Sequence, residues 1–207
     1  MIHFVKSAAL AMLFSLGTLI PAHAEGETPA VAPEPSDFSI GAVDAPVKIV
    51  EYASFTCPHC AHFHEVVFAK LKAEYIDTGK VYFTLREVYF DRYGLWAAIV
   101  ARCGGEMRYF GIHDILFATQ KDWAGSDDPA VVVGNLKTIA LSVGMEAAAV
   151  DACLNDAPMA EALIKRFETN MAADDVKGTP TIFVNGTKYS NMSYEDLKAI
   201  IDAELAK

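Results

Sequence analysis

Two cysteines three positions apart, Cys57 and Cys60, are the side chains of this sequence best suited to chemistry. Two thiols at this spacing can form a disulfide with each other and exchange it with the thiols of another molecule. If a helix begins here, the first sulfur lies beside unpaired backbone N–H groups, where its thiolate is favoured. We therefore predict that Cys57 is the reactive cysteine.

The residues between the cysteines, Pro58 and His59, strengthen this prediction. A protonated His59 would add a positive charge close to the Cys57 sulfur, and Pro58 lacks an N–H group that the first turn of a helix can spare. Together they are expected to lower the pKa of Cys57 below the value of roughly 8.5 for a free thiol. A stable thiolate favours the reduced pair, so the disulfide should pass readily to another protein. This is the profile of an oxidant.

The cysteines are expected to lie within a β-α-β unit. β-branched residues over 47–53 predict a strand that leads to Cys57. Apolar residues at helical spacing predict a helix from Pro58 to about Gly79, and alternating residues over 81–88 predict a second core strand. The pair therefore lies where the helix follows the first core strand.

Only helical patterns fill residues 91–175. Glycines separate them into five segments, expected at about 95–102, 108–119, 129–142, 146–154 and 159–173. A wholly helical block inside an otherwise α/β chain indicates an inserted subdomain.

Strand patterns return at 181–184 and 187–189, joined by the turn pair Asn185-Gly186, and a last helix is expected over 193–205. Since these elements can complete the sheet of the β-α-β unit, we assign residues 37–90 and 176–207 to one domain that surrounds the insertion.

The first residues of the chain have the pattern of an export signal. Residues 1–6 carry one lysine, residues 7–20 are apolar or small, and Ala22-His23-Ala24 is a small-x-small cleavage site. The apolar run is shorter than the roughly 18 to 20 residues that cross a bilayer, so we expect cleavage after Ala24. Residues 25–36, rich in proline and glutamate, are predicted to be a flexible leader. An exported protein works where disulfides persist.

The composition limits the partners. The chain has 207 residues, 53% of them hydrophobic, with 17 Lys and Arg against 27 Asp and Glu, which gives a net charge of −10. This hydrophobic content is enough for a substantial core. The negative charge opposes binding to phosphate backbones, so we expect no nucleic-acid partner.

The segment VEYASFTCPHCAHF at residues 50–63 resembles the active-site segment of the DsbA-type periplasmic thiol-disulfide oxidoreductases of the thioredoxin superfamily. The resemblance extends from about Phe38 to the end and includes the helical insertion and the Gly178-Thr179-Pro180-Thr181 segment. It implies an α/β thioredoxin fold with an inserted all-helical subdomain.

The resemblance also implies roles for individual residues. Cys57 would be the nucleophile and Cys60 the resolving cysteine. Pro180 would follow a cis bond and face the disulfide, and Thr179 would offer its backbone to an extended substrate segment. Glu51 would be the buried acid behind the pair. Its place in a strand buried on both faces favours this role over that of an exposed strand carboxylate.

The expected function is donation of the Cys57–Cys60 disulfide, through a mixed disulfide, to unfolded or newly exported proteins. The resemblance implies reoxidation by a membrane quinone-linked oxidase of the DsbB type. We expect a monomer without cofactor or metal, localised in the periplasm. Its substrates should bind a shallow, uncharged groove around His59, Thr179 and Pro180.

Cys103 and Cys153 lie 50 positions apart in the expected insertion. They could be two separate buried thiols, since free cysteine packs as a small hydrophobe. In an oxidising compartment we favour a structural disulfide, which on the chain-entropy model would stabilise the fold by about 3 to 4 kcal/mol.

Three other functions remain open at this point. A disulfide isomerase or reductase, or a reductant for cytochrome maturation, would use the same cysteines, although the short segment before the fold leaves no room for a dimerisation domain of the isomerase kind. A copper chaperone of thioredoxin fold could add His62 and His64 to Cys60 and Cys57 as ligands, but residues at these spacings do not converge on one point of a helix. His62, His64 and His113 are predicted to be surface or groove residues instead.

Overall fold

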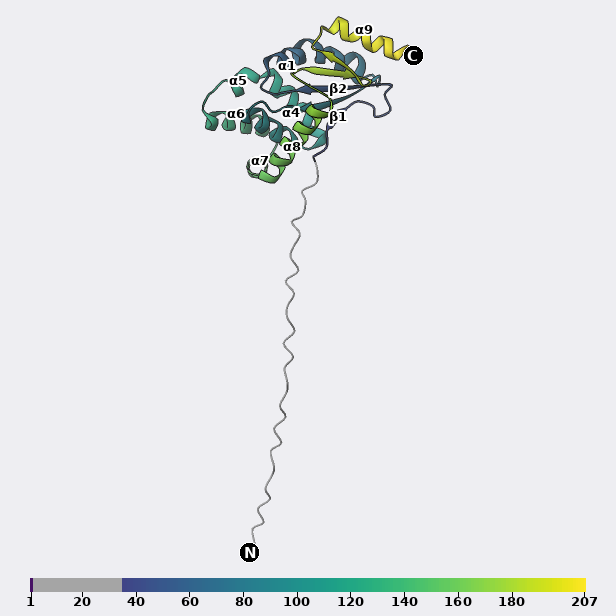
Figure 1. Cartoon of the computed structure of the whole chain (residues 1–207). Coiled ribbons are helices and arrows are strands. Elements are labelled where there is room, and N and C mark those ends of the chain that lie inside the picture. Colours follow the sequence, from purple (N-terminus) through teal and green to yellow (C-terminus); the bar gives the residue numbers. More distant parts are fainter. Residues whose placement is uncertain (2–34) are drawn as a thin grey trace. The chain divides into compact units, whose positions relative to one another are not determined.

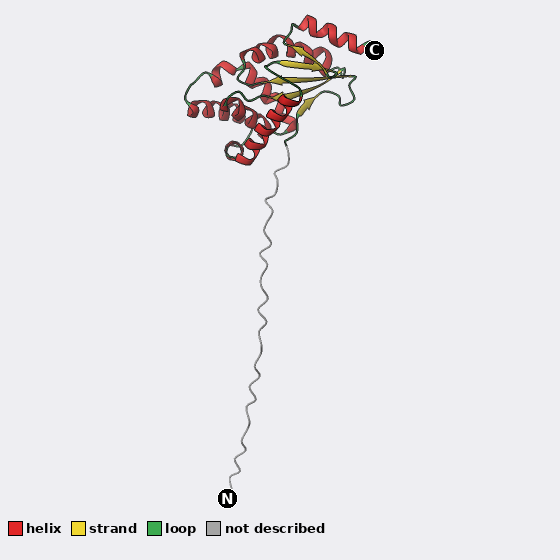
Figure 2. Ribbon diagram, viewed as in Figure 1, coloured by secondary structure: helices red, strands yellow, loops and turns green. Residues whose placement is uncertain are grey.

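The computed structural model describes residue 1 and residues 35–207. Apart from residue 1, the predicted signal peptide lies outside the described residues, and so does most of the predicted leader. Figures 1 and 2 show a sheet with helices on both of its faces. No helix in the described part of the chain is long and apolar enough to cross a membrane.

The sheet has five strands in the order β1-β3-β2-β4-β5. The strands are β1 (Phe38–Ile40), β2 (Val47–Ala53), β3 (Val81–Glu87), β4 (Thr181–Val184) and β5 (Thr187–Ser190). The central strand β2 runs parallel to β3 and antiparallel to β4. The hairpin between β4 and β5 turns at Asn185 and Gly186, which both have positive φ angles, as this residue pair favours.

Strand β2 is buried on both faces because each face meets a different set of helices. Val47, Ile49 and Ala53 belong to the main core, while Tyr52 packs in a smaller cluster with residues of α8 (Ala157–Ala173). Side chains alternate along a strand, so Glu51 shares the face of Ile49 and Ala53. The acid is therefore directed into the main core.

The helix after β2 is continuous but not uniform. It consists of α1 (Pro58–Phe63), η1 (His64–Phe68), α2 (Ala69–Leu71) and η2 (Lys72–Ile76), in which η1 and η2 are wider, π-helical turns. Its buried residues recur every four positions, at 60, 64 and 68 and at 63, 67, 71 and 75. Because an α-helix has 3.6 residues per turn, such a row drifts around it, and wider turns keep the row facing the sheet. The sequence predicted the helix but not these turns.

Six helices follow β3, which confirms the prediction of a helical insertion before β4. They are α3 (Arg92–Cys103), α4 (Glu106–Ala118), α5 (Gln120–Ala124), α6 (Pro129–Ser142), α7 (Ala147–Leu154) and α8. Asp91, Asp128 and Asp156 cap three of them by accepting hydrogen bonds from backbone N–H groups. The short helix α5 was not predicted. The boundaries assigned to the two domains stay a prediction.

The insertion and the sheet share one hydrophobic core. Its fully buried members include Phe83 and Leu85 of β3, Ile112 and Leu116 of α4, and Trp123 of α5. The last helix, α9 (Tyr194–Leu205), is capped by Ser193 and covers the same face of the sheet as α1 (Figure 1). The helices of the insertion are therefore packed against the elements that carry the cysteines.

Candidate active site

The cysteine pair lies at the junction of β2 and α1. Strand β2 ends at Ala53, and Cys57 is the N-cap residue of α1, with Pro58 at the first helical position. The Cys57 N–H group donates to the Ser54 carbonyl oxygen at 3.1 Å, and the N–H groups of Cys60 and Ala61 donate back to the Cys57 carbonyl oxygen. The prediction that a helix begins at the cysteines is confirmed.

Two polar side chains of the insertion hold this junction. Gln120 Nε2 donates to the backbone carbonyl oxygens of Phe55 at 2.8 Å and of Cys57 at 3.0 Å. The Thr56 hydroxyl group donates to Asp91 Oδ2 at 2.6 Å, and Asp91 in turn caps α3. No pattern in the sequence pointed to Gln120, because its contact depends on how the unpredicted helix α5 packs.

The two thiols are free and differ in exposure. Cys57 is half-buried and Cys60 is fully buried. The Cys57 thiol lies against the loop before β4, where the Thr179–Pro180 peptide bond is cis, and it donates to the Thr179 carbonyl oxygen at 3.6 Å. Pairing of β4 with β2 brings this loop to the cysteines.

The surroundings shift the pKa values of the two thiols in opposite directions. Hydrogen bonding by the Cys60 thiol is the main cause that lowers the pKa of Cys57 to about 5, with further help from Thr179 and from the backbone N–H groups of Cys60 and His59, against the opposing effect of burial. Burial raises the pKa of Cys60 above its usual range, and so do the neighbouring Cys57 and Glu51. His59 is exposed and acts here through its backbone N–H group rather than its ring. Cys57 is thus the thiolate at neutral pH, and Cys60 is the thiol.

Glu51 is fully buried on the core face of β2. Burial raises its pKa to about 8, and the nearby Cys57 adds to this rise while His113 opposes it. The carboxyl group therefore carries a proton at neutral pH. The alternative of an exposed strand carboxylate is excluded.

The prediction for the histidines was right for one and wrong for two. His62 is exposed, but His64 and His113 are 7% and 0% exposed. His64 Nε2 lies 3.1 Å from Glu51 Oε2, although the geometry is not that of a hydrogen bond. The four-residue spacing from Cys60 to His64 puts both on one helix face, and the structure shows that this face is the inward one.

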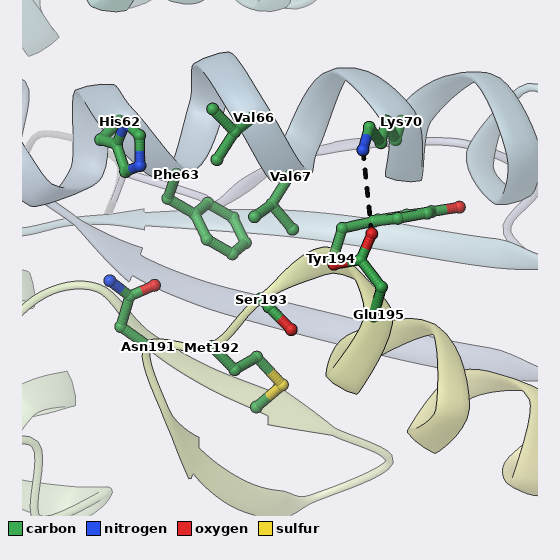
Figure 3. Close-up of a pocket in the computed structure, with 10 residues that line it drawn as sticks. All are labelled: His62, Phe63, Val66, Val67, Lys70, Asn191, Met192, Ser193, Tyr194 and Glu195. Carbon is green, nitrogen blue, oxygen red and sulfur yellow. Dashed lines mark ion pairs between the residues drawn. The ribbon is translucent and has the colours of Figure 1, made fainter.

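A cavity of about 470 Å³ lies beside the first turns of the helix. Figure 3 shows Phe63 and Val67 directed from the helix toward the loop at Met192 and Ser193, with an ion pair between Lys70 and Glu195 at one end. Its lining does not include the residues that we expected to form a groove, His59, Thr179 and Pro180.

The second cysteine pair forms a disulfide. Cys103, at the end of α3, is bonded to Cys153 of α7, with Cα atoms 6.1 Å apart. Within the described residues, no group of three or more His, Cys, Asp or Glu side chains is arranged to hold a metal ion.

Comparison with known proteins agrees with this geometry. A family model described as thioredoxin matches residues 34–203. The chain belongs to the thioredoxin family. Its fold also matches the crystal structure of α-DsbA1 from Wolbachia pipientis, with a TM-score of 0.76 and 28% identity over 83% of this chain and 92% of that one. The predicted thioredoxin fold with a helical insertion is confirmed, and so is the resemblance to DsbA-type proteins.

Two relatives of this chain carry names that refer to disulfides. A putative protein-disulfide oxidoreductase of Rickettsia bellii is 34% identical over 81% of this chain, which covers 64% of that relative's length. A probable disulfide bond formation protein D of Bacillus cereus is 30% identical over 82% of this chain and 79% of the relative.

Proposed function

We propose that this protein is a thiol-disulfide oxidoreductase that oxidises dithiols in other proteins by donating its Cys57–Cys60 disulfide. The observation that carries the proposal is the contrast between the two thiols. Cys57 is accessible and has a pKa of about 5, while Cys60 is buried with a raised pKa. One sulfur is thus suited to exchange with a substrate, and the other to close or leave the internal disulfide.

The reaction begins when a substrate thiolate attacks Cys57 Sγ of the oxidised enzyme. The bond between the two enzyme sulfurs breaks, its electron pair goes to Cys60 Sγ, and a mixed disulfide forms at Cys57. Because the Cys60 thiolate is disfavoured by burial, it takes a proton, for which the protonated Glu51 carboxyl group is the nearby source. A second substrate thiolate then attacks the substrate sulfur of the mixed disulfide and releases Cys57 as a stable thiolate.

The direction of the reaction follows from the same contrast. Hydrogen bonds stabilise the Cys57 thiolate, which exists only in the reduced enzyme. Stabilising the reduced state makes the disulfide more oxidising, so electrons flow from substrate to enzyme.

Thr179 and Pro180 would position the substrate. The bond between them is cis, and the Thr179 carbonyl oxygen lies 3.6 Å from the Cys57 sulfur. A partly exposed backbone segment beside a reactive sulfur can pair with an extended peptide in the manner of an added strand. We assign binding of unfolded substrate segments to this loop.

The working cycle needs an export route and an electron acceptor. The signal-like residues 1–24 support a periplasmic location, where newly exported proteins would be the substrates. A DsbB-type membrane oxidase would reoxidise the reduced enzyme, so that this chain needs no cofactor of its own. The monomeric state is part of the same proposal.

The decisive experiment measures redox equilibrium and turnover together. The protein is equilibrated with graded ratios of reduced and oxidised glutathione, and the oxidised form is then mixed with a dithiol peptide. We expect a potential well above that of thioredoxin, about −270 mV, together with peptide oxidation. Cys57→Ser should abolish oxidation, and Cys60→Ser should accumulate mixed disulfides. A potential near that of thioredoxin would make the protein a reductant and overturn the proposal.

A further inference from the structure

A cluster of buried ionisable side chains lies behind the cysteine pair. It consists of Glu51 of β2, His64 of η1 and His113 of α4, all buried. Both carboxyl oxygens of Glu51, both ring nitrogens of His64 and Nε2 of His113 have no hydrogen-bond partner among the described residues. Buried polar atoms are normally paired, since leaving one unpaired costs about 1 to 3 kcal/mol. Five such atoms in one cluster call for an explanation beyond packing.

These groups form a row from the carboxyl group to the surface. Glu51 Oε2 lies 3.1 Å from His64 Nε2. The rings of His64 and His113 meet edge to face with their centroids 4.5 Å apart. His113 Nδ1 then lies 2.8 Å from Oδ1 of Asp114, whose side chain is exposed. The row therefore joins the buried carboxyl group, through two buried imidazoles, to an exposed acid.

The surroundings keep the two imidazoles neutral. The His64 ring stacks on Phe117 at a centroid distance of 4.0 Å, and the His113 ring lies among Phe68, Phe110 and Phe117. Burial lowers the pKa of His64 to about 3 and lowers that of His113. A neutral imidazole has one donor and one acceptor nitrogen, so it can accept a proton on one side while giving one up on the other.

Few other charges face the cluster. From α1 they are the thiols of Cys57 and Cys60, and from α4 the carboxylate of Asp114. Strand β3 contributes Leu85 opposite Glu51, and β4 contributes Ile182, neither of which titrates. The charge of the cluster therefore depends on the redox state of the cysteines and on one exposed acid.

We propose that His64 and His113 relay a proton between solvent and the carboxyl group of Glu51. The relay rests on the proposed function, because it supplies the proton that Glu51 gives to Cys60. When Cys60 leaves as a thiolate, it takes the Glu51 proton, His64 passes its proton to Glu51, His113 passes one to His64, and solvent at Asp114 replaces it. One proton enters, and no electrons move along the relay. Reoxidation of the cysteines runs the same path outward.

The relay explains how a proton can reach Glu51 from solvent while a substrate is bound. Glu51 is sealed from solvent, and the exposed side of the cysteines is where the substrate binds during exchange. The row of imidazoles opens instead at α4, in the helical insertion. The proton can therefore move while the substrate covers Cys57.

A two-phase reaction isolates the step that needs the relay. Reduced enzyme attacks the aromatic disulfide of Ellman's reagent through Cys57 and releases one coloured thiolate. Cys60 then attacks the resulting mixed disulfide and releases a second, after losing its proton. We propose to follow both phases in the wild type, His113→Phe and Asp114→Asn, in H₂O and D₂O. Glu106→Gln is the control, because Glu106 is an exposed acid at the other end of α4.

The relay predicts an effect on the second phase alone. His113→Phe should slow the second phase at least about tenfold. This minimum is smaller than the roughly 10²- to 10⁴-fold that positioned proton-transfer groups contribute. Asp114→Asn should slow it less and enlarge its solvent isotope effect, and both variants should keep the first phase and the glutathione equilibrium of the wild type. Asp114→Asn tests the surface end without altering the core, should His113→Phe fail to fold.

The outcomes separate the relay from the function it serves. If the wild type oxidises a dithiol peptide but all variants match it in both phases and in isotope effect, the relay is wrong and the proposed function stands. If the wild type does not oxidise the peptide, the proposed function itself fails. An equal slowing by Glu106→Gln would also contradict the relay.

Discussion

The Cys57 thiol lies 3.6 Å from the backbone carbonyl oxygen of Thr179, the residue that precedes the cis proline. This contact joins the loop after β2 to the loop before β4, two segments more than a hundred residues apart in the chain. The Thr179 hydroxyl group is buried and has no hydrogen-bond partner among the described residues, so it is free to donate to a Cys57 thiolate. The residue before the proline therefore affects the cysteine through two different groups.

Replacement of the hydroxyl group alone gives the first prediction. Thr179→Val keeps the shape and the carbonyl oxygen but removes a donor that lowers the pKa of Cys57. We expect the pKa of Cys57 to rise above about 5 and the disulfide to become less oxidising. The ultraviolet absorbance of the thiolate, titrated against pH, measures the pKa directly.

Thr181→Val is the matched control for this change. The Thr181 hydroxyl group donates to the Gly178 carbonyl oxygen at 2.7 Å and not to a cysteine. This variant should leave the titration of Cys57 where it is. A Thr179→Val protein with an unchanged titration would show that the Thr179 hydroxyl group does not stabilise the Cys57 thiolate.

Glu51→Gln gives the second prediction, which concerns the pH dependence of stability. In the folded protein the pKa of Glu51 is raised from 4.5 to about 8 by burial. The folded state therefore holds a proton that the unfolded chain has lost between these values. The contribution of this proton to the free energy of unfolding is fully present below about pH 4.5 and is lost as the pH rises through about 8. Urea unfolding at several pH values should show this fall in the wild type and not in Glu51→Gln.

The wild type and Glu51→Gln are best compared in the oxidised form, in which Cys57 does not titrate. The Cys57 thiolate stabilises the reduced fold increasingly as the pH rises from about 5 toward 9, which opposes the effect of Glu51. Formation of the disulfide removes the titration of Cys57. Subtracting the pH–stability curve of Glu51→Gln from that of the wild type then cancels the contributions of the other titrating side chains. Parallel curves for wild type and Glu51→Gln would contradict the raised pKa.

Local patterns in the sequence predicted the elements that carry the cysteines. The alternation over residues 47–53, the Asn185-Gly186 turn and the proline after Cys57 each specify a conformation through near neighbours, and the structure has the expected element in each place. The buried acid could be predicted as well, because a strand covered on both faces leaves Glu51 no route to solvent.

The parts that the sequence did not predict depend on packing between distant segments. Whether a histidine such as His64 is buried is decided by which helix face meets the insertion, and the two wider turns alter that face. Gln120 is recognisable as important only when α5 is seen against the carbonyl oxygens of the cysteine loop. Such contacts leave no periodic signal.

Gln120→Met gives the third prediction. The methionine has a similar volume but removes the N–H donors to the carbonyl oxygens of Phe55 and Cys57. Because these acceptors are largely buried, we expect a loss of about 1 to 3 kcal/mol in the free energy of unfolding. The looser loop should also weaken the hydrogen bonds that favour the Cys57 thiolate, so that the pKa of Cys57 rises.

Asn135→Leu is the control for Gln120→Met. Asn135 Nδ2 donates to the carbonyl oxygens of Asp122 and Trp123 in the same helical region, away from the cysteine loop. It should lower stability without changing the titration of Cys57. If both variants leave that titration unchanged, Gln120 only stabilises the fold.

The Cys103–Cys153 disulfide gives the last prediction. It closes a loop of 50 positions between α3 and α7. On the chain-entropy model, Cys103→Ser combined with Cys153→Ser should lower the free energy of unfolding by about 3 to 4 kcal/mol. The double variant is preferable to either single one, which would leave a thiol able to mispair with Cys57. Urea unfolding of the oxidised proteins measures the difference.

Dithiol oxidation should survive the loss of this disulfide. Cys103 lies at the end of α3, while Asp91, which contacts the cysteine loop through Thr56, caps its beginning. At 1.5 Å per residue the two ends of this 12-residue helix are roughly 16 Å apart, so the bond has no direct contact with the reacting sulfurs. Peptide oxidation by the double variant, measured below its unfolding transition, should therefore match the wild type. A loss of activity in the folded variant would instead show that the disulfide holds α3 in the position that the active site requires.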